Sequence, residues 1–319
     1  MKKLFLALSV LAMLIFAAVP SHALLSMPDA VPGTDVLLPF FLSKITSGES
    51  TLIVVQEVDG NATTLTVDVF DIDSTSRHDT SETLSGYDVG AWNVRDDWVA
   101  NASSTDKAAL EIDLDGDGTN DHYAGYVKMV NSNTCDNNLV AFIYQIDLAS
   151  GVASGALAVT EECEKTVTTN ANLVDGNDIE VFDATALVTA KALLAGVAPQ
   201  AAASFAMYPR YFVYNSNGHN YLFSWRSTDR AVTRHLDFYN DEEKSYSGNI
   251  TLTHELDILN ITDILPSGHM SAYPYVGWIN FTLANYNDEW IMYSYQNVLD
   301  EAAGTSWCAL FDVHRTAGT

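Results

Sequence analysis

Residues 113 to 121 carry the clearest chemical pattern in the chain, because aspartates alternate with other residues in Asp-Leu-Asp-Gly-Asp-Gly-Thr-Asn-Asp. Calcium takes about six to eight hard oxygen ligands, and alternate carboxylates of a tight loop converge on one point, with glycine allowing the sharp turn. The predicted ligands are the oxygen-bearing residues at alternate positions: Asp113, Asp115, Asp117, Thr119 and Asp121. The sequence therefore predicts a Ca²⁺ site with a structural role.

This loop differs from an EF-hand in two ways. Its twelfth position is Ala124, where an EF-hand places a bidentate glutamate. Its flanks, residues 109–112 and 122–130, have the pattern of strands rather than helices. We therefore expect a calcium loop that joins two strands, as in extracellular proteins. The alternative is a solvated acidic Asp-Gly turn.

No catalytic signature is complete, so the sequence predicts no catalytic residue. Residues 151–155, Gly-Val-Ala-Ser-Gly, have the wrong spacing for a nucleophile elbow and are typical of a hairpin turn. His254 and Glu255 begin like a zinc motif, but Ile258 stands where the second histidine is required. A catalytic carboxylate pair cannot be chosen among 41 acidic residues. We expect a protein that is not an enzyme, and an extracellular hydrolase is the least favoured alternative.

Aromatic residues concentrate after Phe205, and one stretch among them suggests a binding surface. Alternation along residues 277–283 places one set of side chains on the outside of a sheet. This candidate ligand platform consists of Trp278, Asn280 and Thr282. An indole beside amide and hydroxyl groups suits stacking on a sugar, and it equally suits contact with another subunit. Ordinary core packing is the third interpretation.

The chain begins with a predicted secretory signal peptide, residues 1–23. Lys2 and Lys3 give a positive start, residues 4–19 are apolar, and residues 21–23, Ser-His-Ala, suit a cleavage site. No later stretch approaches the roughly 20 apolar residues that a membrane-spanning helix needs. We expect an exported protein without a membrane span, located in the extracellular space, at the cell surface or in the periplasm.

The formal net charge of −26 limits the partners of the chain. An acidic surface repels nucleic acid and anionic lipid, so neither is an expected partner. Self-association and an extracellular polysaccharide are the partners that the sequence leaves open.

The chain has three cysteines. Cys135 and Cys163 flank a predicted strand-turn-strand unit, and they are the candidate disulfide in an oxidising compartment. Cys308 lies in an alternating stretch that predicts a strand, and we expect a buried, inert thiol there.

Most of the chain has a period of two, with clusters of Gly, Asn, Asp and Ser at short intervals, which predicts an all-β fold of sandwiches. Several stretches recur in the same order in both halves, among them 67–71 with 236–240, 93–96 with 260–263, and 123–127 with 275–279. The second copy lacks a counterpart of the calcium loop. We therefore predict two tandem, related β-sandwich domains.

The predicted organisation assigns every part of the chain to one of five segments. These are the signal peptide (1–23), an N-terminal lead (24–35), a first β-sandwich domain with the calcium loop (36–163), a connector (164–204) and a second β-sandwich domain (205–319). Residues 183–196 of the connector have a capping aspartate, good helix formers and a closing glycine, which predicts one short helix.

The chain resembles a group of exported bacterial proteins of unknown role at residues 49–55 and at the stretch Leu-Ser-Gly-Tyr-Asp-Val at 84–89, which is followed by Asn-Val-Arg-Asp at 93–96. Those proteins carry a Thr-Thr-Leu strand and a Leu-Thr-Gly-Tyr-Asp-Val stretch that ends in Asn-Leu-Arg-Asp. The resemblance covers mainly the first predicted domain. It implies a bacterial cell-surface β protein and brings no catalytic residues.

Together these patterns favour a secreted or cell-surface, non-enzymatic structural or adhesive protein that calcium stabilises. The first alternative is a carbohydrate-binding protein that uses aromatic residues of the second domain, and the second alternative is an extracellular hydrolase.

Overall fold

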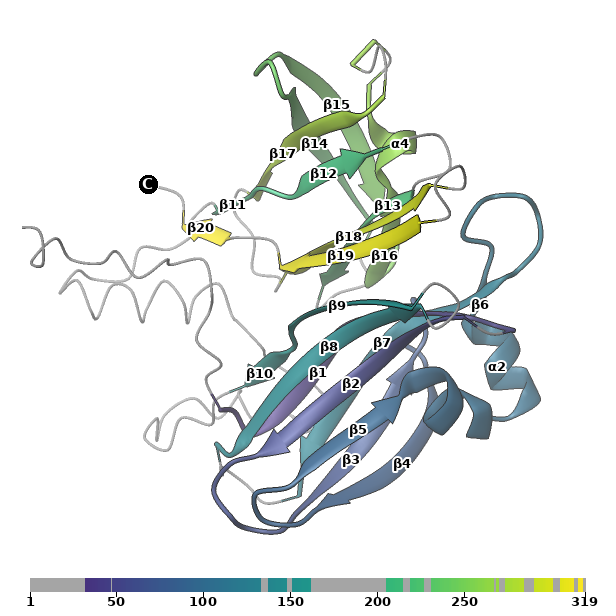
Figure 1. Ribbon diagram of the computed structural model, residues 1–319, viewed down its shortest axis with the longest axis vertical. Coiled ribbons are helices and arrows are strands. Elements are labelled where there is room, and N and C mark those ends of the chain that lie inside the picture. Colours follow the sequence, from purple (N-terminus) through teal and green to yellow (C-terminus); the bar gives the residue numbers. More distant parts are fainter. Residues whose placement is uncertain are drawn as a thin grey trace, which may run out of the picture. The chain divides into compact units, whose positions relative to one another are not determined.

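Most of the residues that the structure describes lie in antiparallel strands, which confirms the predicted all-β fold (Figure 1). The computed structural model describes residues 32–46, 48–132, 137–147, 151–161, 205–214, 219–226, 231–266, 268–269, 273–283, 290–300, 305–312 and 315–317. The predicted signal peptide, the connector helix at 183–196, Cys135 and Cys163 lie outside the described residues.

The first half, residues 32–161, forms two sheets. Its strands are β1 (Asp35–Lys44), β2 (Glu49–Glu57), β3 (Thr63–Phe70), β4 (Ser76–Leu84), β5 (Val89–Asn93), β6 (Glu111–Ile112), β7 (His122–Asn131), β8 (Leu139–Asp147), β9 (Val152–Leu157) and β10 (Val159–Glu161). The first small sheet has the order β5-β2-β8-β9. The first large sheet has the order β10-β1-β7-β3-β4, with β6 paired to β7.

The second half, residues 205–317, also forms two sheets. Its elements are β11 (Phe205–Met207), β12 (Arg210–Val213), β13 (His219–Arg226), β14 (Val232–Asn240), β15 (Ser245–Leu252), β16 (Leu256–Asn260), α4 (Ile261–Ile264), β17 (Tyr275–Leu283), β18 (Trp290–Asp300), β19 (Thr305–Asp312) and β20 (Arg315–Ala317). The second small sheet has the order β16-β13-β18-β19. The second large sheet has the order β20-β11-β17-β14-β15, with β12 paired to β17.

The two halves have the same order of sequence-equivalent strands. The first strand is irregular at the same place in both halves, because proline cannot donate a ladder hydrogen bond. In the first half, β1 passes Pro39 with a register shift between Leu38 and Phe41. In the second half, the equivalent Pro209 separates β11 from β12, and both of these strands pair with β17.

An aromatic pair on the large sheet is also repeated. Phe70 on β3 and Tyr126 on β7 face each other in register, and their rings stack at 4.8 Å. The equivalent Tyr239 on β14 and Trp278 on β17 are in register as well, and their rings stack at 4.0 Å. The repeat seen in the sequence is therefore also a repeat of side-chain packing.

The second small sheet is buried on both faces, because it contributes to two hydrophobic clusters. Side chains such as Phe223 and Tyr293 belong to the cluster that also contains the core of the first half. Their neighbours Leu222 and Met292 point the other way, into the cluster of the second half. Residues 221–226 and 291–296 are accordingly buried at every position. Pro32 to Thr319 therefore form one compact unit.

A helical insertion follows β5 in the first half. It comprises η1 (Val94–Trp98), η2 (Val99–Asn101) and α2 (Ser104–Leu110), and β6 and the aspartate-rich loop come after it. The prediction of a strand at 109–112 was wrong for its first two residues, which end α2. The helix forms because Ser103 accepts a hydrogen bond from the Asp106 backbone N–H at its amino end. No helix among the described residues is long and apolar enough to cross a membrane.

Candidate functional site

The aspartate-rich loop, residues 113–121, connects β6 to β7 on the first large sheet. Its base is closed by backbone hydrogen bonds, from the Asp121 N–H to the Ile112 carbonyl (3.1 Å) and from the Ile45 N–H to the Asp121 carbonyl (3.0 Å). The two ends of the loop are therefore fixed by the sheet, while Asp115 and Asp117 at its tip are exposed.

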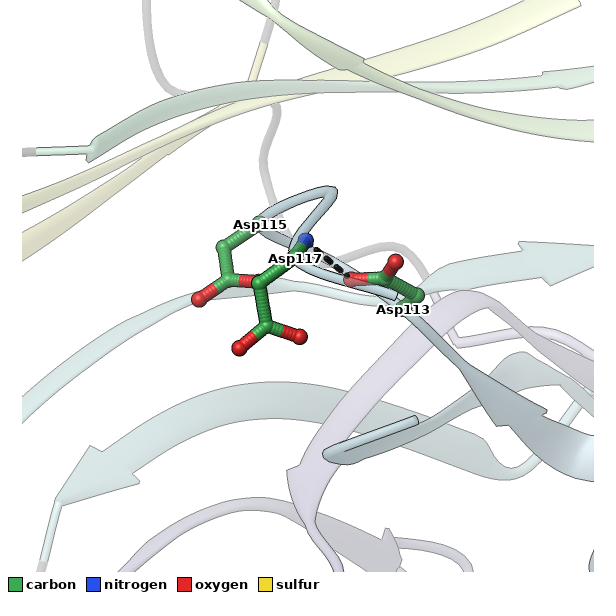
Figure 2. A group of neighbouring side chains, drawn as sticks. All are labelled: Asp113, Asp115 and Asp117. Carbon is green, nitrogen blue, oxygen red and sulfur yellow. Dashed lines mark hydrogen bonds between the residues drawn. The ribbon is translucent and has the colours of Figure 1, made fainter. Parts of the chain in front are cut away.

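Three carboxylates come together in this loop, as Figure 2 shows. Asp113, Asp115 and Asp117 each offer an oxygen atom, and these atoms lie within 4.8 Å of one another. Calcium–oxygen distances are about 2.3 to 2.6 Å, so two ligands on opposite sides of one ion are about 5 Å apart. The spacing and the hard carboxylate oxygens both fit calcium, and they supply three of the oxygens that it needs.

Backbone N–H groups organise the loop around the first aspartate. The Asp113 carboxylate accepts hydrogen bonds from the N–H groups of Gly116 (2.8 Å), Asp117 (3.2 Å) and Gly118 (2.7 Å). Gly118, whose N–H donates to Asp113, has a φ of +90°, which other residues rarely adopt. The loop is shaped by its own hydrogen bonds, with the Asp115 and Asp117 side chains beside the anchored carboxylate.

Two of the predicted ligands have other contacts. Thr119 donates its backbone N–H to Asp117 Oδ1 at 2.7 Å. Asp121 does not belong to the group of three converging carboxylates. Its Oδ1 lies 2.7 Å from His122 Nδ1 and accepts the Leu114 N–H at 3.4 Å. Asp121 therefore holds the base of the loop in this structure.

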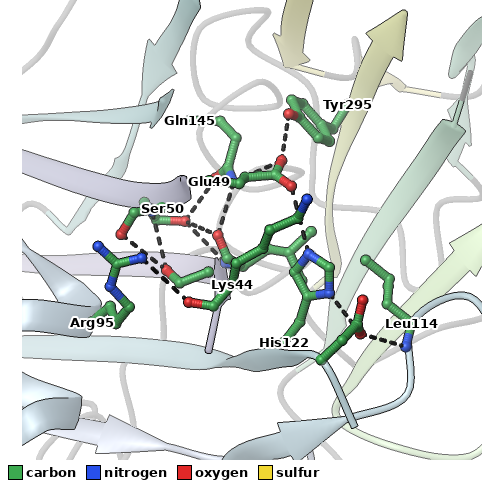
Figure 3. Close-up of polar contacts among 12 residues, drawn as sticks. Lys44, Glu49, Ser50, Arg95, Leu114, His122, Gln145 and Tyr295 are labelled. Carbon is green, nitrogen blue, oxygen red and sulfur yellow. Dashed lines mark hydrogen bonds and ion pairs between the residues drawn. The ribbon is translucent and has the colours of Figure 1, made fainter. Parts of the chain in front are cut away.

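His122 connects the loop to a buried polar network, shown in Figure 3. Its side chain is buried, and its Nε2 lies 3.6 Å from Oε2 of the equally buried Glu49. Glu49 Oε1 accepts hydrogen bonds from Gln145 Nε2 (3.1 Å) and from the Tyr295 hydroxyl. Asp121, His122 and Glu49 thus form a continuous path from the loop of the first half to a strand of the second.

The environment of His122 changes its acidity. Burial lowers the pKa of His122, but the carboxylates of Glu49 and Asp121 raise it by more, and the net pKa lies above the ordinary value. The charged imidazolium is therefore favoured between two carboxylates. A buried charge needs such partners, which indicates a structural ion-pair group.

Sequence reasoning missed this network. The histidines looked scattered, because Glu49, His122 and Tyr295 are far apart along the chain. One local signal was present: His122 directly follows the last aspartate of the loop and begins a strand whose other residues are mostly apolar. The partner on β2 could be found only from the folding of the two sheets.

The candidate platform on β17 lies on the outer side of the second large sheet. Ile279 and Phe281 are fully buried, whereas Trp278 and Asn280, which alternate with them, are half-buried. The backbone of Thr282 pairs with Ala206 on β11, and its side chain lies outside the described part of the structure. The structure adds that Trp278 stacks on Tyr239 and also meets the edge of Tyr208, with a centroid distance of 5.7 Å.

Polar side chains continue the outer face beyond the aromatic rings of Trp278, Tyr239 and Tyr208. Asp237 is in register with Asn280 and accepts a hydrogen bond from the Ser247 hydroxyl at 2.7 Å. One row further, His235 contacts Asn249 at 3.1 Å. The outer face therefore has an aromatic part and a part rich in hydrogen-bonding groups.

The other residues singled out by sequence have structural positions. In the 151–155 stretch, Gly151 forms the turn before β9 and has a φ of +71°. The Ser154 hydroxyl accepts a hydrogen bond from the Leu310 N–H at 2.7 Å. His254 pairs with Asp73 of the first half. Cys308 lies on β19 in register with Asn297.

The fold and the site define the class of the chain as an all-β, sandwich-like protein with a repeated topology and an aspartate-rich loop in one copy. No family model, curated protein or solved structure matches it.

Proposed function

We propose that the chain is an exported, non-enzymatic structural or adhesive protein, outside the cell or at its surface, and that calcium bound at Asp113, Asp115 and Asp117 stabilises it. The observation that carries this proposal is the group of three carboxylates within 4.8 Å of one another. The predicted signal peptide and the resemblance to exported bacterial proteins support the location. Because no neighbouring protein suggests a reaction, the proposal depends on the loop and its connection to the fold.

The position of the loop favours a structural role for the ion. Its base is tied through Asp121 and His122 to Glu49, and Glu49 accepts a hydrogen bond from Tyr295 of the other half. An ion that orders the loop also holds this base in place. The formal net charge of −26 destabilises a compact chain through self-repulsion, and a bound dication relieves part of it.

Calcium should bind this chain with a dissociation constant of about 0.1 to 1 mM, the range of extracellular modules. Equilibrium dialysis of residues 24–319 with labelled calcium measures it. Asp115→Asn and Asp117→Asn should each weaken the strongest site about tenfold or more, because each removes one of the three converging carboxylates.

The control for general attraction of calcium to an acidic chain is Asp241→Asn, which removes one charge from an exposed turn of the second half. It should leave the strongest site unchanged. Equal weakening by Asp241→Asn and Asp115→Asn, or no saturable site at all, would refute a specific calcium loop.

A second candidate function is carbohydrate binding by the outer face of the second large sheet. The observation that favours it is the half-buried Trp278 beside Asn280 and the row of Asp237 and Ser247. Sugars stack on aromatic rings and hydrogen-bond to such groups. Trp278→Ala should then abolish binding to a polysaccharide array while the melting temperature stays the same. If the unmodified chain binds no polysaccharide and Trp278→Ala only lowers the melting temperature, Trp278 is a packing residue.

A further inference from the structure

The outer face of the second large sheet repeats a surface that is covered in the first half. We name this surface of each half the receiving face. In the first half it includes Phe40, Phe70 and Tyr126, of which Phe40 and Tyr126 are buried. The equivalent residues of the second half are Arg210, Tyr239 and Trp278. Arg210 is exposed, and both aromatic rings are half-buried.

The side chains that cover the first receiving face come from the second small sheet. Phe40 stacks on Phe223 at 3.9 Å and meets Tyr293 at 5.5 Å, and Tyr126 meets Trp225 edge-on at 6.0 Å. We name this outward side of a small sheet the docking face. In the second half it is almost fully buried: Phe223 is 1% exposed and Leu256 is 1% exposed.

The first small sheet has an equivalent docking face. Val54 pairs with Phe142 across β2 and β8, just as Phe223 pairs with Tyr293 across β13 and β18. Val89, at the start of β5, corresponds to Leu256 at the start of β16. Val54 and Phe142 are only half-buried, and Val89 is 55% exposed. The first half thus has an apolar docking face that is exposed in part, where its counterpart is covered.

We propose that the docking face of the first half binds the receiving face of the second half in another copy of this chain. Each copy then repeats between molecules the contact that its own halves make within the molecule. The occupant is a second copy because the covered pair of faces inside the chain shows the complementary surface. This inference deepens the proposed structural function and rests on that role, but it does not require calcium.

The two receiving faces differ at one position, and this difference changes the chemistry of the contact. Arg210 stands where the first receiving face has Phe40. Within the chain Phe40 stacks on Phe223 at 3.9 Å and meets Tyr293 at 5.5 Å, so by equivalence Arg210 lies against Val54 and meets Phe142 beside it. A guanidinium over an aromatic ring forms a favourable cation–π contact. The exposed Val276, 40% accessible and next to Trp278, adds apolar area to the same receiving face.

The two faces are different surfaces, so a single contact between two copies is head-to-tail and leaves one face of each kind free for further copies. A heterologous contact of this kind produces open chains of molecules when the rotation between copies does not close a ring. The acidic charge opposes growth at low salt, where repulsion between copies extends further. Assembly should therefore strengthen with ionic strength.

Sedimentation velocity of residues 24–319 at an ionic strength of about 0.15 M tests the proposal. The average mass should rise continuously with protein concentration and exceed two copies. Trp278→Arg and Val276→Arg on the receiving face, and Phe142→Arg and Val89→Arg on the docking face, should each give monomers. Val276 and Val89 are the decisive positions because both side chains are exposed, so that an arginine there can point into solvent without disturbing the core. Thr83→Arg, on an exposed position of β4, is the control and should assemble like the unmodified chain.

Mixing the two kinds of variant gives the sharpest outcome. A Val276→Arg chain keeps an intact docking face, and a Val89→Arg chain keeps an intact receiving face, so the mixture should form a species of two copies and nothing larger. A monomeric unmodified chain at every concentration, a mixture that stays monomeric, or polysaccharide binding through Trp278 by a chain that never assembles would overturn the proposal. Runs in calcium and in EDTA separate this result from the calcium proposal, because assembly in EDTA supports the contact even if no calcium site exists.

Discussion

Replacing Gly277 with alanine should lower the free energy of unfolding by about 3 kcal/mol or more, at the upper end of the cost of overpacking. A β-carbon at this position would lie 2.0 Å from the Tyr239 carbonyl oxygen and 2.2 Å from the Tyr211 hydroxyl. The carbonyl belongs to the neighbouring strand and also accepts the Tyr211 hydroxyl at 3.0 Å, so it cannot move without shifting β14. Urea unfolding measures the change.

Gly248→Ala is the matched control on the same sheet. A β-carbon there would have its nearest neighbours at 3.4 Å and 3.6 Å, which is ordinary contact. Its effect should stay below about 1 kcal/mol. The repeat offers a second test, because a β-carbon at Gly125 would lie 2.0 Å from the Phe70 carbonyl oxygen. Gly125→Ala should be as damaging as Gly277→Ala. Similar stability of the Gly277 and Gly248 variants would contradict the described register.

Replacing Glu49 with alanine should cost about 3 to 5 kcal/mol, the range for breaking a buried ion pair by removing one partner. His122 would lose one of the two carboxylates that favour its charged form. Gln145 would lose its hydrogen bond to Oε1, and the Tyr295 hydroxyl would lose its buried acceptor. Thermal and urea unfolding in EDTA measure the change without any contribution from bound calcium.

Two milder substitutions show which part of the effect comes from charge. Glu49→Gln keeps an acceptor oxygen but removes the charge next to His122, and it should be less damaging than Glu49→Ala. Tyr295→Phe removes one hydroxyl and should cost about 1 kcal/mol. If Glu49→Ala costs no more than Tyr295→Phe, the carboxylate does not hold the network together.

The topology of the chain could be predicted to a useful degree from local patterns. Alternation predicted the strands, and the recurrence of stretches such as 123–127 and 275–279 predicted two copies of one arrangement. The stacked pairs Phe70–Tyr126 and Tyr239–Trp278 show that the recurrence extends to packing. Alternation also placed Trp278 opposite Ile279, but it could not identify Tyr239 as its partner, because register between strands is a property of the sheet.

The contact between the halves could not be predicted, because period-two alternation does not distinguish a solvent face from a face covered by another sheet. Phe223 and Leu222 are both buried, on opposite sides of the same strand. Part of the aromatic excess after Phe205 comes from this second covered face. A continuous apolar run such as residues 221–223, Tyr-Leu-Phe, is the sequence signal for it, since sheets covered on both faces have near-continuous apolar strands.

The candidate site was predictable where its members are close in sequence. Asp113, Asp115 and Asp117 come together because alternate positions of one tight loop converge. Asp121 has a different role because it is adjacent to His122, whose other partner is the distant Glu49. The helix α2 was missed because it is only 7 residues long and depends on the Ser103 cap more than on apolar periodicity.

The central claim is that the aspartate-rich loop stabilises both halves together as one unit, and differential scanning calorimetry of residues 24–319 tests it most directly. With calcium at about ten times its dissociation constant, mass action adds about 1.4 kcal/mol, or about 2 °C for a chain of this size. We predict one transition in EDTA that moves upward as a whole in calcium. Two separate transitions, with calcium shifting one of them or neither, would contradict the account.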